Sequence, residues 1–157
     1  MKLKNPIKVK QGKKNRQAGA RFELKVRANL ESKGWIVDKW SNNVEFENED
    51  WSDKKGNNVY CPPARLVKVK NKFLGAGKPM MLGAGFPDFI SFKQAVGIGG
   101  AFELYEIIGV ESKSNGKLNK EEKEKCDWYL ENKIFSKILI ASNGEKRGEI
   151  KYKEYQK

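Results

Sequence analysis

The chain has 157 residues, enough for one domain, and it contains two cysteines and no histidine, which excludes zinc fingers and all chemistry that needs imidazole. Its 32 Lys and Arg residues against 20 Asp and Glu give a net charge of +12, which favours a polyanionic partner. No apolar run is long enough to span a membrane, and the Lys-rich N-terminus lacks the apolar region of a signal peptide, so we expect a cytoplasmic protein without a membrane partner.

Residues 1–16 contain several lysines and an arginine but no acidic residue. This composition predicts a flexible basic arm, which is either simply solvated or lies along phosphate groups, and we favour the phosphate contact. The basic residues that we expect to contact nucleic acid, in the arm and just after it, are Lys8, Lys10, Lys13, Lys14, Arg16 and Arg21.

The segment 17–33 has apolar residues at alternate positions, a period that by itself would fit a strand. It is too long for most strands, however, and it is rich in Arg, Glu, Leu, Lys and Ala, which favour helices. Gly34 follows it at a position that suits the residue after a helix. We therefore predict a helix with Phe22, Val26 and Leu30 facing the core.

Residues 35–40 read as a short strand, and residues 41–84 show no sustained period of either kind. We predict that 41–84 is an insertion, either a long loop or a peripheral hairpin. Its acidic cluster at 45–53 lacks the ligand pattern of a calcium loop and is most simply solvated.

The segments 88–96 and 101–113 are apolar and partly β-branched, and the glycine-rich segment 97–100 separates them. This pattern predicts two antiparallel strands joined by a glycine turn.

A second helix is predicted over 119–133, because Asn119 and Glu122 have the spacing of a capping box and apolar residues then recur at helical spacing. Two further strands are predicted at 134–142 and 148–155.

Asp88 begins the first strand of the predicted hairpin and Glu111 lies near the end of the second, although carboxylates are costly to bury in a sheet. Folding at the turn brings the two to the same open end. Lys113, two residues after Glu111, projects to the same face about 6–7 Å away. Two carboxylates can hold Mg²⁺ or Mn²⁺, and a neighbouring lysine can position water and stabilise a phosphoryl transition state. These groups point to hydrolysis of a phosphodiester.

At Pro87-Asp88 and Glu111-Ser112-Lys113 the chain resembles the PD-(D/E)XK nuclease superfamily. The order of predicted elements is similar to the αβββαβ core of that superfamily, which implies an α/β, restriction-endonuclease-like fold with a mixed central sheet flanked by helices. The resemblance covers about 17–141, with 41–84 as an insertion, so the expected nuclease domain is 17–157. The stretch RFELKVRANLESKGW and the basic charge are similar to archaeal Holliday-junction resolvases, whereas GFPDF and GKLNKEEKEKCDWYLENK are similar to the VRR-NUC branch.

The resemblance implies a Mg²⁺-dependent DNA endonuclease in which Mn²⁺ can substitute. It assigns metal binding to Asp88, Glu111, the Ser112 backbone carbonyl and Glu23, and it assigns the attacking water to Lys113. The catalytic residues would thus be Asp88, Glu111, Lys113 and Glu23. It also implies a homodimer that cuts branched DNA in recombination or repair. The expected protein is an intracellular one of prokaryotic or viral type.

Simpler structural roles remain open for the same residues. Asp88 could be an ordinary acid at a strand start, Glu111 and Lys113 a solvent-facing ion pair, and Glu23 a solvated acid. Glu122, at a position where many superfamily members carry glutamine, is fully explained as the acid of the capping box. The tryptophans fit a core better than a base-stacking role; they are Trp35, Trp40, Trp51 and Trp128.

Two alternative functions also remain open. One is a sequence-specific restriction or homing endonuclease that uses the insertion at 41–84 for recognition. The other is a nucleic-acid-binding protein that has a nuclease-like scaffold and no activity.

Overall fold

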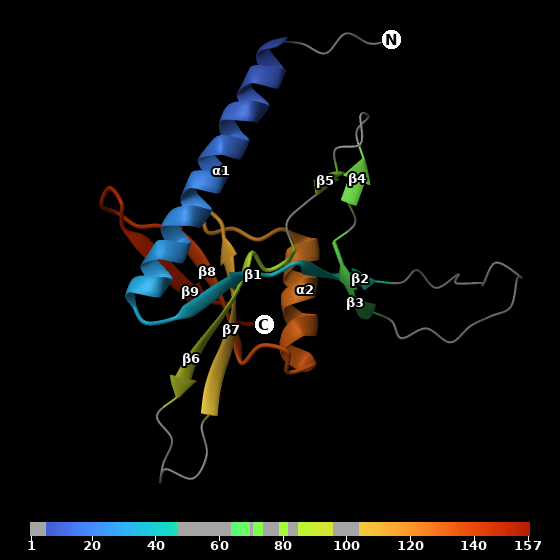
Figure 1. The fold of residues 1–157 in the computed structure, drawn as a ribbon, viewed down its shortest axis with the longest axis vertical. Coiled ribbons are helices and arrows are strands. Elements are labelled where there is room, and N and C mark those ends of the chain that lie inside the picture. The colour runs from blue at the N-terminus through green and yellow to red at the C-terminus, as the bar shows by residue number, and fades with distance from the viewer. Residues whose placement is uncertain (1–5, 47–63, 70, 74–78, 82–84, 96–103) are drawn as a thin grey trace, which may run out of the picture.

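The computed structural model describes residues 6–46, 64–69, 71–73, 79–81, 85–95 and 104–157 (Figure 1). The elements follow one another in the order α1 (Pro6–Ser32), β1 (Ile36–Lys39), β2 (Asn42–Phe46), β3 (Ala64–Lys68), β4 (Asn71–Phe73), β5 (Pro79–Met81), β6 (Phe89–Ala95), β7 (Leu104–Ser112), α2 (Lys120–Glu131), β8 (Lys137–Asn143) and β9 (Ile150–Glu154).

A mixed five-stranded sheet forms the centre of the molecule, with the strand order β1-β6-β7-β8-β9. β7 and β8 are parallel, and the other neighbours are antiparallel. β7 and β8 can be parallel because α2 lies between them in the chain and carries it from the end of β7 back to the end of the sheet where β7 begins. The predicted mixed α/β sheet with flanking helices is thereby confirmed.

The two helices cover opposite faces of this sheet. Phe22, Val26 and Leu30 of α1 are buried, as predicted, and belong to one apolar cluster that also contains Val37, Phe89, Ile108, Val110 and Ala141. The α2 side has a second cluster, made of Val44, Ala64, Phe86, Cys126, Tyr129, Phe135, Ile138 and Ile140. Because side chains alternate along a strand, Ile108 and Val110 of β7 face α1, and Gly109 and Glu111 face α2.

The tryptophans that the structure describes are part of this packing rather than a stacking surface. Trp35 packs on the α1 cluster, and Trp40 and Trp128 pack on the α2 cluster. The Trp40 indole N–H donates to the Tyr129 hydroxyl at 3.1 Å. The predicted core role is confirmed for these three, and Trp51 lies outside the described residues.

The N-terminal segment differs from its prediction, because residues 6–16 are not a flexible arm but the first part of α1. Pro6 is tolerated in a first helical turn, where its missing N–H has no helical partner to lose, and no later proline interrupts the segment. All residues from 10 to 20 are exposed, and Figure 1 shows this part of α1 projecting away from the sheet. The basic residues are thus carried on a helix. Residues 1–5 lie outside the described part of the chain.

The insertion at 41–84 contains short strands, so the hairpin alternative is correct for its described parts. β2 pairs with β3, and β4 pairs with β5, both antiparallel. Val44 of β2 and Ala64 of β3 are buried in the α2 cluster, which attaches the first pair to the core. The residues of the acidic cluster from 47 to 53, and the glycine turn at 97–100, lie outside the described residues.

The strands and the helix that the sequence predicts after residue 87 are present, although their ends differ by a few residues from the predicted ones. The hairpin of β6 and β7 and the second helix are confirmed, and the strand predicted at 134–142 begins at Lys137. Among the described residues, no helix is both long and apolar enough to cross a membrane.

Candidate active site

Asp88 and Glu111 meet at one end of the β6–β7 hairpin, as the sequence predicted. Phe89 pairs with Val110, so the residues just beyond this pair lie opposite each other. The Asp88 backbone N–H donates to Glu111 Oε2 at 3.0 Å, and the Ser112 backbone N–H donates to Asp88 Oδ2 at 2.9 Å. Asp88 is 7% exposed and Glu111 4%. Each carboxylate is therefore held by the backbone of the other strand.

The chain before Asp88 is fixed by its contact with the segment after β1. The Trp40 N–H donates to the Asp88 carbonyl at 3.1 Å, and the Phe86 N–H donates to the Asn42 carbonyl at 3.0 Å. A Cβ at Gly85 would lie 2.1 Å from the Trp40 carbonyl oxygen, so only glycine allows the two backbones to approach this closely.

A second glycine makes room for the same segment from β7. A Cβ at Gly109 would lie 2.8 Å from Pro87 Cγ and 3.1 Å from the Phe135 ring. Pro87 and Phe135 thus pack directly over the β7 backbone two residues before Glu111. The two glycines explain locally why the sequence around Asp88 and that around Glu111 fit together.

Lys113 lies between two carboxylates. Its Nζ is 3.1 Å from Glu111 Oε1 and 2.6 Å from Glu122 Oε1. Burial lowers the pKa of Lys113, but the hydrogen bonds and charges of Glu122 and Glu111 outweigh it, so the pKa is raised overall. The lysine is therefore positively charged at neutral pH.

Glu122 has two roles at once. Its Oε2 accepts from the Asn119 N–H at 2.9 Å while the Asn119 side chain accepts from the Glu122 N–H at 2.9 Å, which completes the predicted capping box. Its Oε1 meanwhile binds Lys113. The sequence indicated the first role and left open whether this acid also serves the site.

Glu23 reaches the site only through a lysine that the sequence analysis missed. Lys39 Nζ lies 2.5 Å from Glu23 Oε2 and 3.9 Å from Asp88 Oδ1, so it connects the helix acid to the strand acid. Lys39 pairs with Phe89 across β1 and β6, which places it beside Asp88. Predicting an antiparallel pairing of residues 35–40 with the Asp88 strand would have identified it.

Burial dominates the electrostatics of the two central carboxyls. It raises the pKa of Asp88, with Glu23 adding to the effect, against the Ser112 N–H, Lys39 and Lys113, which lower it. Burial, followed by the charge of Asp88, raises the pKa of Glu111 from 4.5 to about 7 against the opposing effect of Lys113. Two adjacent buried carboxylates thus resist carrying full negative charge near neutral pH.

The donor chemistry fits a divalent cation at Asp88 and Glu111. Both offer the hard oxygen ligands that Mg²⁺ and Mn²⁺ prefer, and a cation would offset the unfavourable charge that their burial creates. Within the described residues, no group of three or more His, Cys, Asp or Glu side chains is arranged to hold a metal ion. This agrees with Glu23 being engaged by Lys39. The fit therefore rests on two carboxylates, with the Ser112 carbonyl a predicted further ligand.

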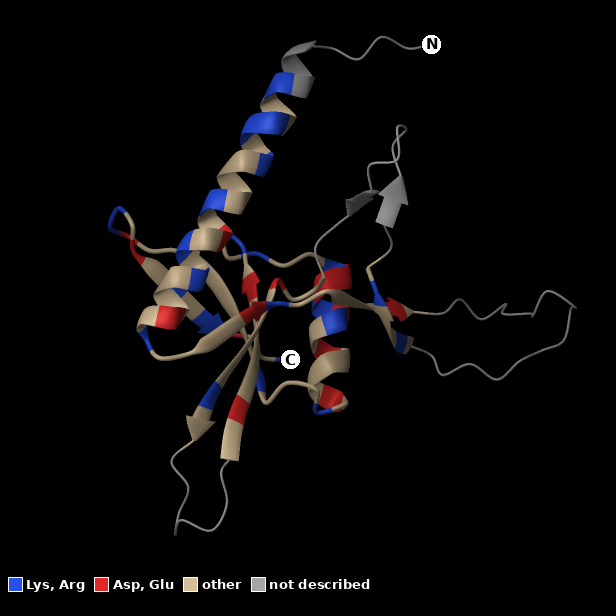
Figure 2. Cartoon of the chain, in the orientation of Figure 1, with Lys and Arg blue, Asp and Glu red and all other residues tan. Residues whose placement is uncertain are grey.

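The basic residues predicted to contact nucleic acid all lie on α1, and Figure 2 shows the Lys and Arg positions along this helix. Arg21 is close to the site, because it lines a cavity together with Ser112 and Lys113. The others lie farther along the projecting part of the helix, and those with described side chains are exposed; they are Lys10, Lys13, Lys14 and Arg16. Lys8 belongs to α1, but its side chain lies outside the described part.

Comparisons of the chain with protein-family models, with curated proteins and with solved structures found no match.

Proposed function

We propose that this protein is a divalent-metal-dependent DNA endonuclease that hydrolyses phosphodiester bonds. The observation that carries the proposal is the meeting of Asp88, Glu111 and Lys113 at one end of the β6–β7 hairpin. A structural ion pair between Glu111 and Lys113 has no need of a second buried carboxylate, because Asp88 adds to the effect of burial in raising the pKa of Glu111. The order of elements around the central sheet supports a restriction-endonuclease-like core.

In this proposal each residue has a defined task. A Mg²⁺ or Mn²⁺ ion held by Asp88, Glu111 and the Ser112 carbonyl would lower the pKa of a bound water and offset charge on the leaving oxygen. Lys113, kept charged by its two carboxylate partners, orients the attacking water and stabilises the negative charge of the transition state. Glu122 positions Lys113 from α2, and Lys39 limits the repulsion between Glu23 and Asp88.

The substrate in this proposal is branched DNA, and the protein acts as a homodimer. The exposed cations of α1 support binding to phosphates without reading of bases. The preference for branches and the dimer follow from the resemblance to junction resolvases. Cleavage of a four-way junction against random duplex, and sedimentation equilibrium, test the two points separately.

The central test is cleavage of a labelled four-way junction and its linear duplex control in Mg²⁺ or Mn²⁺. We expect the wild type to cut and Lys113→Ala to lose about 100-fold or more in rate, because the charge beside the reacting phosphate is gone. Lys117→Ala is the matched control, since Lys117 is an exposed lysine on the same connection to α2. Equal rates for wild type and Lys113→Ala, or no metal-dependent cutting in the wild type, would contradict the proposal.

A second candidate is a nucleic-acid-binding protein without catalysis. It is favoured by the pairing of Lys113 with both Glu111 and Glu122 and by the lack of a third acidic ligand among the described residues. Calorimetric titration with Mg²⁺ and Mn²⁺, with and without DNA, distinguishes the two. Absence of any metal binding would select the second candidate.

A further inference from the structure

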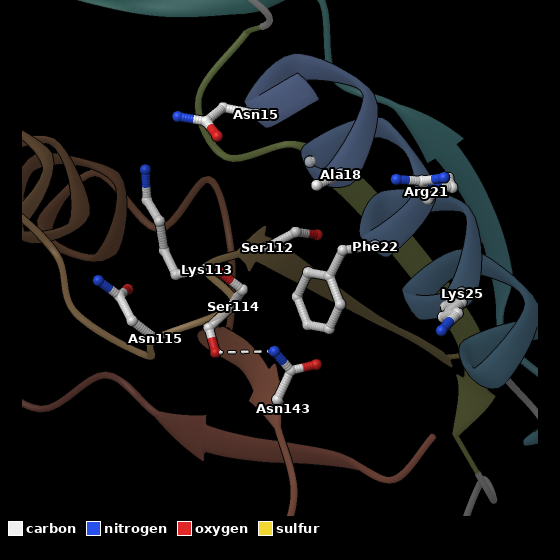
Figure 3. Close-up of a pocket in the computed structure, with 11 residues that line it drawn as sticks. Asn15, Ala18, Arg21, Phe22, Lys25, Ser112, Lys113, Ser114, Asn115 and Asn143 are labelled. Atoms are coloured by element: carbon white, nitrogen blue, oxygen red, sulfur yellow. Dashed lines mark hydrogen bonds between the residues drawn. The ribbon is translucent and has the colours of Figure 1, made fainter. Parts of the chain in front are cut away.

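A cavity of about 630 Å³ lies between α1 and the segment that follows β7 (Figure 3). Three cationic side chains line it, Arg21 and Lys25 from α1 and Lys113 from the opposite wall, together with the amides of Asn15, Asn115 and Asn143. No Asp or Glu is among the described residues that line it. The cavity therefore differs in charge from the adjoining carboxylate centre.

The fold creates this space through small residues and strand alternation. Ala18 and Gly19 line the cavity from α1, and a Cβ at Gly19 would meet nothing within 4 Å. Ser112, at the end of β7, is on the α1 face with Val110, one residue after Glu111 on the other face. Its N–H binds Asp88 while its side chain lines the cavity, so one residue belongs to both sites.

The wall opposite α1 is held by its own hydrogen bonds. The Asn143 side-chain amide donates to the Ser114 carbonyl at 3.2 Å, as drawn in Figure 3, and the Asn115 Oδ1 accepts from the Lys117 N–H at 3.1 Å. Gly116 closes the turn in the left-handed region, with φ of 68°. Because the side-chain oxygen of Asn115 already accepts a hydrogen bond within the turn, the side-chain NH2 group is the part of this amide that can donate to a ligand.

Several groups in the cavity have no partner among the described residues. Neither Arg21 nor Lys25 forms an ion pair with any residue in the described part of the chain. The Ser112 hydroxyl oxygen is buried and has no hydrogen-bond partner there either, and Figure 3 shows this side chain directed toward α1. A buried hydroxyl without a partner is unfavourable, and a ligand in the adjoining cavity would satisfy it if the Ser112 side chain rotated toward that ligand.

We propose that this cavity binds a backbone phosphate of DNA, next to the phosphate that reacts at Asp88 and Glu111. Arg21 and Lys25, which form no ion pair with the described residues, and the amide donors beside them are the chemistry that recognises a phosphate, whereas the charge of Lys113 is shared with Glu111 and Glu122. The identity of the ligand as DNA rests on the proposed function. Ser112 connects the cavity to the carboxylate centre, so a strand that reaches one passes the other. Lys14, one turn before Ala18, continues the same face of α1 and would meet the next part of the strand.

The test compares two double variants that each remove two positive charges. Arg21→Gln with Lys25→Gln removes the cations of the cavity. Lys123→Gln with Lys153→Gln is the matched control, because these lysines line a separate cavity of about 560 Å³ that also contains Glu154. All four residues are exposed, so both variants should fold, and circular dichroism checks this.

The first measurement is an NMR titration with inorganic phosphate in the presence of EDTA. We expect saturable shifts of the Asn115 and Asn143 side-chain amides in the wild type and the control, and their loss in Arg21→Gln with Lys25→Gln. Shifts that persist in that variant, or that map elsewhere in the wild type, would overturn the proposal.

The second measurement is fluorescence anisotropy of a labelled duplex, again in EDTA, over a range of salt concentrations. We expect the cavity variant to bind about 10-fold more weakly, with a salt slope reduced by about one to two, and the control to change about 2-fold at most. An equal loss of DNA affinity in both variants would overturn the proposal that this cavity binds a phosphate.

EDTA removes cleavage from both measurements, which separates this proposal from the nuclease proposal. Phosphate shifts without cleavage by the wild type would refute only the nuclease. Cleavage with no phosphate shifts and unchanged affinity in the cavity variant would refute only the cavity.

Discussion

Glu111 and Glu122 each have a structural and a chemical task at the site. Glu111 accepts a backbone N–H from Asp88 and binds the charge of Lys113, and Glu122 caps α2 while holding the same lysine. Replacing such an acid by its neutral isostere separates the two tasks, because the amide can keep the hydrogen bond to the backbone while the negative charge beside Lys113 is removed.

Glu111 should make folding stability fall as pH rises. Its pKa is raised by burial from 4.5 to about 7 in the folded protein, so between these values the folded state binds more protons than the unfolded state. The cost of ionising it thus grows across this window and is complete above it. We expect Glu111→Gln to be more stable than the wild type by about 1–3 kcal/mol at pH 8 and equal to it at pH 4.

Urea unfolding in EDTA at the two pH values measures this difference. Glu124→Gln is the control, because Glu124 is exposed and its ion pair with Lys120 is a surface one of little energy. A Glu111→Gln variant that is less stable than the wild type at pH 8 would contradict the prediction that ionised Glu111 destabilises the folded protein.

The two tasks of Glu122 should separate in Glu122→Gln and Glu122→Ala. Glutamine can still accept the Asn119 N–H, so we expect its stability to stay within about 0.5 kcal/mol of the wild type, whereas alanine loses about 0.5–2 kcal/mol with the capping box. Both variants remove the negative charge from Lys113 and should lower its pKa. Denaturant unfolding and the pH of Lys113 side-chain titration by NMR give the two readouts. Equal stability losses in both variants would contradict the separation.

At the scale of elements, α1 is one helix with two environments. Its second half is packed on the sheet through Phe22, Val26 and Leu30, and the first half is exposed and carries much of the basic charge. The β6–β7 hairpin, in contrast, is packed closely enough that a methyl group at Gly109 has no room.

Adding one methyl group should therefore have opposite effects in these two elements. Gly12→Ala, in open space, should increase helix content and local amide protection in the first half of α1, by about 0.5–1 kcal/mol, with little change in the global melting temperature. Gly109→Ala should destabilise the whole protein by about 1–3 kcal/mol, because Pro87 and Phe135 must shift. Circular dichroism and hydrogen exchange measure both effects. A lower helix content in Gly12→Ala would contradict a helical first half.

At the scale of the whole molecule, two apolar clusters share one sheet. Leu30 belongs to the cluster under α1 and Ile138 to the cluster under α2, and β8 contributes side chains to both, since Ala141 belongs to the first cluster and Ile140 to the second. Cooperative unfolding of the two faces is the expected consequence, because neither helix can leave without exposing a face of the sheet that they share.

Leu30→Ala and Ile138→Ala should accordingly shift the same single unfolding transition. Each creates a cavity in a fully packed site and should cost about 2–5 kcal/mol. Urea unfolding followed by tryptophan fluorescence and by far-ultraviolet circular dichroism should give coincident curves for both variants. Separate transitions for the two probes would show that the faces unfold independently.

The core elements and the meeting of the two carboxylates follow from patterns in the amino-acid sequence. Two apolar, partly β-branched runs separated by a glycine-rich segment predict the hairpin, so Asp88 and Glu111 converge once its strands pair, and the spacing of Asn119 and Glu122 predicts the start of α2. These are local patterns, or pairings between neighbouring segments, and local physical chemistry is sufficient to predict them.

The distant groups that join the two carboxylates are known only from the folded chain. The bridge from Glu23 through Lys39 to Asp88 depends on the pairing of β1 with β6. The proposed phosphate-binding cavity depends on α1 lying across the end of β7, near Ser112 and Asn143. The helical state of residues 6–16 was also missed, because basic residues suit an exposed helix and a solvated arm alike. Contacts between segments far apart in the chain depend on strand order and helix position, which no local period encodes.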